Sequence, residues 1–513
     1  MARLLYYIFK LYFVKIILSV ISLFLFTISI AQDAATDTLK ITDKSNFGKP
    51  DNTNIKDRNI YDTSIGNRSH NKYGDLLNDD PVYNPKHPFY IPAAKVLFAD
   101  AVNWAANRYL FNYDFAYISA RTWKENLRAG FEWDNDHFGT NFFAHPYSGN
   151  NYFNIARSNG YNYWQSFPFA VEGSLIWEYF GENTHPSKND IINTPISGAF
   201  LGEVLYRLSS NILDDRTRGG NRFFRELLAG ILDPARAINR LTQGKMFRVT
   251  NKEVYQKEPL NITLNGGIHK INANNKFFTG PTNFTLNMQL DYGDPFEVRH
   301  RKPFDVFRIS TESSFGSSRK IVGNITGYGL LFGKNIIKGE NATLVGGFQY
   351  YDYWNNKIFE LGSLGFGVGV INRVPILKIS ELYSSVHFAV VPLAANNTNF
   401  GPDTSLFRDY NFGGGLEAKI EETLNLKFAS FGFKGYYYWL HNYENLSGNS
   451  SIGILKPRVI INFSKSVGVG IEHQAYFVNR TIKGVPSLHL IRTEQRLFLQ
   501  VFLEDPKRRG RYH

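Results

Sequence analysis

Alternation of apolar and polar residues runs from 257 to 504 and constrains the fold more than any other feature. In the segment 283–291 every even-numbered residue is apolar and every odd-numbered residue is polar. Such a period of two places the apolar side chains on one face of a β-strand. Most of these segments are near the roughly 9–11 residues of a tilted membrane strand. About twelve of them occur, near 259–269, 283–292, 304–315, 319–333, 342–353, 357–371, 376–392, 409–420, 424–438, 452–463, 466–478 and 493–503.

The outward faces of these segments distinguish a membrane barrel from a soluble sandwich. A sandwich also alternates, but its outer face is usually charged, whereas here Tyr, Phe and Leu alternate with Ser, Thr, Asn and Gly. The chain contains no cysteine, which excludes disulfides and thiolate metal sites. We therefore predict an α+β chain whose residues 257–504 form an antiparallel outer-membrane β-barrel of about 12 strands, followed by a basic tail at 505–513.

The N-terminal residues predict export. Residues 1–31 resemble a signal peptide, because Arg3, Lys10 and Lys15 precede an apolar run at 16–30. An uncleaved anchor is the alternative, but the run is shorter than the roughly 20 residues of a spanning helix. Residues 32–89 are polar, show no period, and predict a disordered lead. The predicted location is the outer membrane.

The formal charge of +12 favours an anionic partner, with a charge balance that serves no specific partner as the alternative. The export signal and the missing recognition motif argue against nucleic acid as that partner. Outer-membrane lipid or lipopolysaccharide is the expected partner, since both present anionic groups. The sequence leaves the oligomeric state open.

Between 90 and 250 the apolar period is helical. In a helix predicted from Asn189 or Asp190 to about Leu213, Gly198 and Gly202 form a G-x-x-x-G strip without side chains. This strip predicts close approach of another helix or of the barrel wall. Because the helices are polar and lie directly before the first strand, we predict that this module plugs or caps the barrel.

The helical module resembles the DUF3943 domain family, which is found in exported, barrel-bearing proteins of Gram-negative bacteria. The resemblance covers about 90–250 and implies no activity, because none is attached to the family. The residues that carry it are Trp133, Asp134, Asn135, Asp136, Asn141, His145, Pro146, Tyr147, Gly149, Tyr152, Phe153, Asn154, Arg157, Ser158, Asn159, Gly160, Trp164, Glu178, Asp190, Gly198, Gly202, Glu203, Arg207, Asp214, Asp215, Arg216, Asn221, Arg222, Phe223, Phe224, Arg225 and Glu226.

One histidine with several carboxylates is the candidate for catalysis, because G-x-S-x-G, H-E-x-x-H and P-loop motifs are missing from the sequence. His145 is a candidate general base oriented by Asp134, Asp136 or Glu178, with Ser148 or a water as the nucleophile. The alternative is that His145 belongs to a structural corner at His145-Pro146-Tyr147.

The same carboxylates, with Asp190, offer the oxygen ligands that calcium or magnesium prefers. Their spacing is not that of an EF-hand, and Asp134-Asn135-Asp136 also suits a turn or cap. We predict no cofactor and no metal site, with a calcium or magnesium ion as the alternative.

Charged residues elsewhere in the module are candidates for binding. Glu203 and Arg207 have the spacing of an intrahelical ion pair. Arg157, Arg222 and Arg225 suit bidentate contacts with lipid phosphates, or pairing with Asp190, Asp214 or Asp215.

Two classes of function follow. The first is an outer-membrane protein with a transport, channel or envelope-assembly role. The alternative is an outer-membrane hydrolase that acts on lipid or lipopolysaccharide through His145 and the nearby carboxylates. The sequence does not decide whether the protein is an enzyme.

Overall fold

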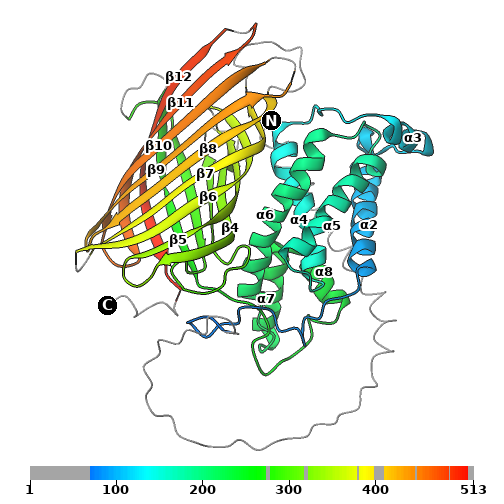
Figure 1. Ribbon diagram of the computed structural model, residues 1–513, viewed down its shortest axis with the longest axis horizontal. Coiled ribbons are helices and arrows are strands. Elements are labelled where there is room, and N and C mark those ends of the chain that lie inside the picture. Colours follow the sequence, from blue (N-terminus) through cyan, green and yellow to red (C-terminus); the bar gives the residue numbers. More distant parts are fainter. Residues whose placement is uncertain are drawn as a thin grey trace, which may run out of the picture.

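The computed structural model contains a helical module followed by a β-barrel (Figure 1). The predicted signal peptide, much of the predicted polar lead and most of the basic tail lie outside the residues that the structure describes. The described residues are 70–272, 278–316, 322–356, 358–377, 380–397, 410–444, 447–484 and 486–505.

Twelve antiparallel strands close into a barrel, and each strand pairs with its neighbours in sequence. The first and last strands close it, in a register that runs from Ile262 opposite Leu503 to Asn272 opposite Thr493. The predicted fold class is therefore confirmed. The strands are β1 (Leu260–Asn272), β2 (Thr282–Tyr292), β3 (Phe307–Phe315), β4 (Val322–Ile337), β5 (Ala342–Asn355), β6 (Glu360–Leu377), β7 (Ser380–Asn397), β8 (Tyr410–Asn425), β9 (Ala429–Asn442), β10 (Gly448–Asn462), β11 (Val467–Ile482) and β12 (Leu488–Leu503).

The two faces of the barrel wall differ as the alternation predicts. On β7, Val386, Phe388 and Val390 are 45%, 53% and 57% exposed, whereas Ser385 and His387 are buried. A closed wall pairs its own backbone groups, and an apolar outer face suits the hydrocarbon of a membrane. The protein is therefore an outer-membrane β-barrel protein.

Charged side chains cross the lumen. The Arg308 guanidinium on β3 lies 2.5 Å from both the Asp291 and the Glu421 carboxylate, and Glu421 belongs to β8. On β12, Arg496 donates to both carboxylate oxygens of Glu312 at 2.7 and 2.5 Å. The void beside this second pair measures only about 50 Å³. The barrel's own side chains thus fill the lumen at this level.

Seven α-helices form the module in the described part of the chain. Polar caps set several of their starts: Ser119, Asn162 and Ser187 each accept a hydrogen bond from a backbone N–H in the first turn. No helix of the described residues is long and apolar enough to cross a membrane. The helices are α2 (Tyr90–Ala105), α3 (Ala120–Arg128), α4 (His145–Arg157), α5 (Tyr163–Ile176), α6 (Lys188–Ile212), α7 (Gly219–Leu232) and α8 (Pro234–Thr242).

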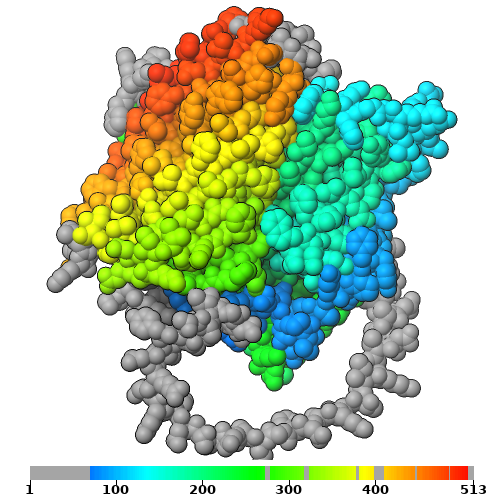
Figure 2. All heavy atoms as spheres, viewed as in Figure 1, coloured from blue at the N-terminus to red at the C-terminus, as the bar shows by residue number. Residues whose placement is uncertain are grey.

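The module lies beside the barrel, against the outside of its wall (Figures 1 and 2). On β5, Gln349 faces outward and donates to the Ile196 carbonyl of α6 at 2.8 Å. Its side-chain oxygen accepts a hydrogen bond from the Tyr163 hydroxyl of α5 at 2.6 Å. Near β8, Trp133 stacks on Phe412 with 4.9 Å between ring centroids. The predicted plug or cap is not confirmed, because apolar and aromatic residues of the outer wall, rather than the lumen, hold the helices.

The predicted glycine strip lies at the closest contact between α4 and α6. A methyl group built on Gly198 would lie 2.5 Å from the carbonyl carbon of Gly149, and one on Gly149 would lie 1.8 Å from the Thr194 carbonyl oxygen. A methyl group on Gly202 would meet the Phe153 ring at 2.7 Å. The backbones are therefore in direct contact, which confirms the close approach that the strip predicts.

Replacing Gly198 by alanine should destabilise the module. The added methyl group meets rigid backbone, so α4 and α6 must separate, and overpacking of this kind costs about 1–3 kcal/mol. Thermal unfolding of the helices, followed by circular dichroism in detergent, measures the effect. Gly220→Ala is the matched control, because that helical glycine has open space around its Cβ position. Equal unfolding temperatures for the two variants would contradict the proposed contact.

Candidate functional site

His145 begins α4, directly after a π-helical turn at Thr140–Ala144. Its Nδ1 atom lies 3.4 Å from the Thr194 hydroxyl. Its Nε2 atom lies 3.6 Å from Asp190 and 3.9 Å from Asp136. The Asp136 side chain is 55% exposed, whereas that of Asp190 is 4% exposed. The structure therefore brings His145 together with two of the predicted carboxylates, near the surface.

Asp134 and Glu178 hold the backbone around this cluster. Asp134 accepts hydrogen bonds from Asn141 and Asn189 at 2.8 and 2.7 Å. Glu178 accepts one from the backbone N–H of Ser187, the residue that caps α6, at 2.7 Å. Burial raises the pKa of Asp134, but the hydrogen bonds with Asp190, Asn189 and Asn141 outweigh it, and the net shift is downward. These two predicted catalytic residues thus fix the loop that orients His145.

The acidic groups around His145 do not form a metal site in the described residues. Across those residues, no group of three or more His, Asp or Glu side chains could hold a metal ion. Asp134 and Glu178 direct their oxygens at amide and backbone donors instead. Asp190 differs, because its buried Oδ1 atom has no hydrogen-bond partner within the described part of the chain. The chemistry that this arrangement offers is proton transfer between imidazole and carboxylate.

A chain of ion pairs links the helices to the barrel. Glu203 on α6 accepts two hydrogen bonds from Arg157 of α4, at 2.7 and 3.0 Å. It also accepts one from Arg207 at 2.8 Å, the predicted intrahelical pair. Arg207 also donates a hydrogen bond to Asp305, in the connection between β2 and β3, at 3.0 Å. These predicted binding residues are therefore mutually paired, and they join α4, α6 and the barrel.

A cavity of about 650 Å³ lies next to these ion pairs, where the helices meet the connection between β2 and β3. We call it the junction cavity. Positive charge dominates its lining, so it suits an anion. The charged residues that line it are Lys86, Arg157, Arg207, Arg236, Arg240, Lys245, Arg301 and Lys302, against Asp79 and Glu203.

Several of these cations have donor atoms available to a ligand. Arg301 is one, because its Nε and Nη1 atoms have no hydrogen-bond partner among the described residues, and Lys245 and Arg236 are two more. Lys245 is 9% exposed, and its ammonium group makes no hydrogen bond or ion pair within the described residues. Burial, aided by repulsion from Arg248, Arg240 and Arg236, lowers the pKa of Lys245 to about 8. The side-chain hydrogen bonds of Arg236 all leave from Nη1, toward the Tyr206 carbonyl and two serine hydroxyls.

Arg236 and Lys245 were missed by sequence reasoning, which named neither as a candidate for binding. The signal was present: Asp233 caps α8 and Pro234 occupies its first turn, so a further helix begins there. That helix carries Arg236 and Arg240 inward. Periodicity alone does not reveal an inward arginine, because it marks polar residues as outward-facing.

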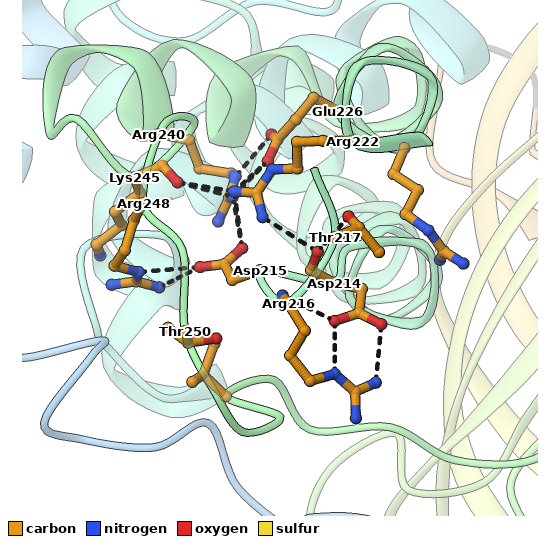
Figure 3. A network of polar contacts seen from close by, with 12 residues as sticks. Asp214, Asp215, Arg216, Thr217, Arg222, Glu226, Arg240, Lys245, Arg248 and Thr250 are labelled. Atoms are coloured by element: carbon orange, nitrogen blue, oxygen red, sulfur yellow. Dashed lines mark hydrogen bonds and ion pairs between the residues drawn. The ribbon is translucent and has the colours of Figure 1, made fainter. Parts of the chain in front are cut away.

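Asp215 is the centre of a further ionic network (Figure 3). Its carboxylate lies 2.9 Å from Arg222, 3.1 Å from Arg240 and 2.7 Å from Arg248. The sequence predicted that Arg222 would either bind lipid phosphate or pair with an aspartate. In the structure it pairs with Asp215. Arg225 instead donates to the Ile212 carbonyl at 2.8 Å.

Removing the charge of Asp215 should unfold this end of the module. The Asp215 carboxylate is fully buried, and breaking a buried ion pair costs about 3–5 kcal/mol. Asp215→Asn should therefore lower the unfolding temperature strongly in a thermal melt. The neighbouring Asp214→Asn is the control, because Asp214 pairs with the half-exposed Arg216, and such pairs contribute about 0–1 kcal/mol. A smaller loss for Asp215→Asn than for Asp214→Asn would contradict the network's role.

The contribution of the same network to the stability of the fold should decrease at acidic pH. Burial raises the pKa of Asp215, but the arginines Arg240, Arg248 and Arg222 outweigh it and lower the pKa overall. A carboxylate whose pKa is lowered in the folded state stabilises the fold at neutral pH. This contribution is lost as the pH falls through the lowered pKa.

Comparison with known proteins gives one family match. Residues 130–235 match the model described as "Domain of unknown function (DUF3943)". No curated protein matches the chain. Among solved structures, the NanC porin is 9% identical and has a TM-score of 0.25, over 47% of this chain and 98% of that chain. The outer-membrane channel DcaP of Acinetobacter baumannii is 8% identical with a TM-score of 0.22, over 48% and 96%.

Similarity at these TM-scores carries no conclusion about this chain, whose barrel is defined by its own strand pairing. The family match lies within the helical module and spans α4, α5, α6 and α7. It includes His145, Glu203 and Asp215, the centres of the three clusters described above. The resemblance seen in the sequence is confirmed for residues 130–235 of this outer-membrane barrel protein, which match the DUF3943 family model.

Proposed function

We propose that the protein binds a phosphorylated amphiphile of the outer membrane, a phospholipid or lipopolysaccharide, in the junction cavity, and so serves lipid transport or envelope assembly. The excess of lysine and arginine in the cavity lining carries this proposal. Phosphate oxygens accept hydrogen bonds from such cations, and charge-assisted bonds are stronger than neutral ones. Lys245 and Arg236 are two of the cations that a ligand meets without displacing a carboxylate. Arg301 and Lys302 are others, since they donate to backbone carbonyls and side-chain amides.

The surroundings of the cavity suit a molecule with both a charged head and an apolar tail. Trp164 and Phe332 belong to its lining and are 56% and 64% exposed. Phe332 is on β4, at the outer surface of the barrel. A headgroup held by the cations would therefore leave its acyl chains beside an aromatic rim.

The filled lumen supports a role for the module rather than free diffusion through the barrel. Ion pairs such as Arg308–Glu421 join strands on opposite sides of the lumen. Opening a path there would separate buried opposite charges, which is costly. We therefore place ligand binding outside the barrel, at its junction with the helices.

Lys245→Met should weaken binding of a phosphorylated amphiphile by about tenfold, since one hydrogen bond to a charged group contributes about 1.5–3 kcal/mol. Native mass spectrometry of the full chain in detergent measures binding of phosphatidic acid, lipid A and diacylglycerol. Phosphatidic acid and lipid A distinguish phospholipid from lipopolysaccharide as the source of the phosphate. Diacylglycerol has no phosphate group and is the negative control. Lys188→Met is the matched control, because Lys188 is an exposed lysine that lies over Trp133 near the His145 cluster.

The pH dependence gives an independent check. The pKa of Lys245 is about 8, so its ammonium is charged below that pH and neutral above it. Binding by the wild-type protein should weaken as the pH rises through 8, and the Lys245→Met variant should show a smaller step. Part of the step remains in the variant because burial also lowers the pKa of Lys302, in the same lining, to about 8. Equal binding of diacylglycerol and phosphatidic acid would refute the proposal.

A hydrolase is the second candidate function, and one observation favours it. His145 has a hydroxyl near one ring nitrogen and a carboxylate near the other, which suits acid–base chemistry. Burial lowers the pKa of His145, but the nearby carboxylates, Asp190 foremost, outweigh it and raise the pKa to about 10, so the imidazole is protonated at neutral pH and suits a general acid. Thr194 is only 3% exposed, so a water rather than this hydroxyl would attack the substrate. Ser148, the other predicted nucleophile, makes no hydrogen bond with His145 among the described contacts.

Lipid analysis of cells separates the two candidates. For a hydrolase, a deletion strain and His145→Ala should accumulate the same lipid species, because both remove the catalytic imidazole. His137→Ala is the control, since that histidine is exposed in the preceding loop. Accumulation in the deletion strain alone would exclude hydrolysis by His145 and leave the binding function.

A further inference from the structure

Helix α2 has the reverse of the polarity expected for a water-soluble helix. Its inward face carries charge: Lys95 donates to Asn239 of α8 at 2.7 Å, and the buried Asp100 accepts a hydrogen bond from Tyr152. A soluble helix directs its apolar stripe inward and its charges outward. From Phe89 to Ala101 the exposed residues of this segment are all uncharged and mostly apolar. They are Phe89, Tyr90, Ala94, Leu97, Phe98 and Ala101.

Helix α7 shows the same reversal. Arg222 and Glu226 face inward and pair with each other at 2.8 Å within the network of Figure 3. Its outward residues are large and apolar, with exposures between 45% and 67%. They are Phe223, Phe224, Leu227, Leu228 and Ile231. No contact with another described element covers them.

Exposed charges gather at the two ends of the module instead. At one end, α3 carries Arg121, Lys124, Glu125 and Arg128. At the other end, where the chain enters β1, Arg216, Arg218 and Lys252 are exposed. Figure 1 shows α3 and α7 at opposite ends of the helices. Apolar surface between two charged rims is the pattern of a protein body that sits in a bilayer.

The dimensions agree with this pattern. Helix α6 has 25 residues and is therefore about 37 Å long at about 1.5 Å per residue. The hydrocarbon core of a bilayer is about 30 Å thick. Helix α6 itself is enclosed by α4, α5 and the barrel wall, so its buried Glu203 and Arg207 do not meet lipid.

We propose that the helical module lies in the outer membrane beside the barrel, with the exposed faces of α2 and α7 in contact with lipid. The apolar surface of the module is then continuous with the apolar outer face of strands such as β7. Hydrocarbon is the one occupant that suits both, because both are apolar and bounded by charge. The inference rests on the location of the barrel, not on the proposed ligand, and it explains why the polar groups of the module face inward.

Single cysteines test this placement directly, because the chain contains none of its own. We would introduce Phe98→Cys on α2 and Leu228→Cys on α7, attach a nitroxide, and reconstitute the full chain in phosphatidylethanolamine–phosphatidylglycerol vesicles. Phe388→Cys on β7 is the lipid reference, and Lys124→Cys on α3 is the water reference. Power saturation measures collisions with oxygen, which concentrates in lipid, and with a nickel chelate, which stays in water.

The labels at residues 98 and 228 should collide with oxygen and lose collisions with nickel, as the label at 388 does. Nickel collisions equal to those at 124 would overturn the proposal. Exclusion of both reagents, with spin–spin broadening between copies, would show that a second copy covers these faces and would also overturn it. A nickel-accessible label at 388 would show instead that the barrel is not inserted. A heat-dependent mobility shift on gels verifies that each variant folds.

Discussion

The buried carboxylate of Glu203 is the constraint on which the rest of the module depends. It neutralises Arg157 and Arg207, and Arg207 extends the chain to Asp305 of the barrel. Two guanidinium groups cannot remain buried without such a partner, because an unpaired buried charge costs several kcal/mol. The position of α6 between α4 and the wall is therefore tied to the pairing of these charges. The glycine contact between α4 and α6 brings the two helices close enough for it to form.

The same constraint shapes both candidate sites. Polar groups that a soluble protein would present to water are here turned inward, where they form the His145 cluster at one end and the junction cavity at the other. Most of them satisfy one another, as Asp215 does with its three arginines. Some do not, among them the Oδ1 atom of Asp190 and the Nε and Nη1 atoms of Arg301, which have no hydrogen-bond partner among the described residues. An apolar exterior and a polar interior are two aspects of one arrangement.

The sequence names some of the residues that the structure brings together, but their catalytic or binding roles stay predictions. His145 lies close to Asp136, which precedes it in the same short segment, and to Asp190 in the first turn of α6. Arg236 and Lys245 were not found, since nothing in the local pattern indicates that a basic residue faces inward. The roles of Asp134 and Glu178 also depended on distances that only folding sets: both bind backbone or amide groups rather than the imidazole.

The sequence by itself determined the barrel, because alternation along a strand is a local property that survives any arrangement of the strands. It also indicated the helical module, since a period of 3.6 is equally local, and a close approach at the glycine strip. Whether a helix or the barrel wall makes that approach was left open. The tertiary structure decided on which side of the wall the module lies. A period of two is the same whether partners approach the wall from the lumen or from outside. Only the hydrogen bonds of Gln349 with α5 and α6, and the stacking of Trp133 on Phe412, resolve it.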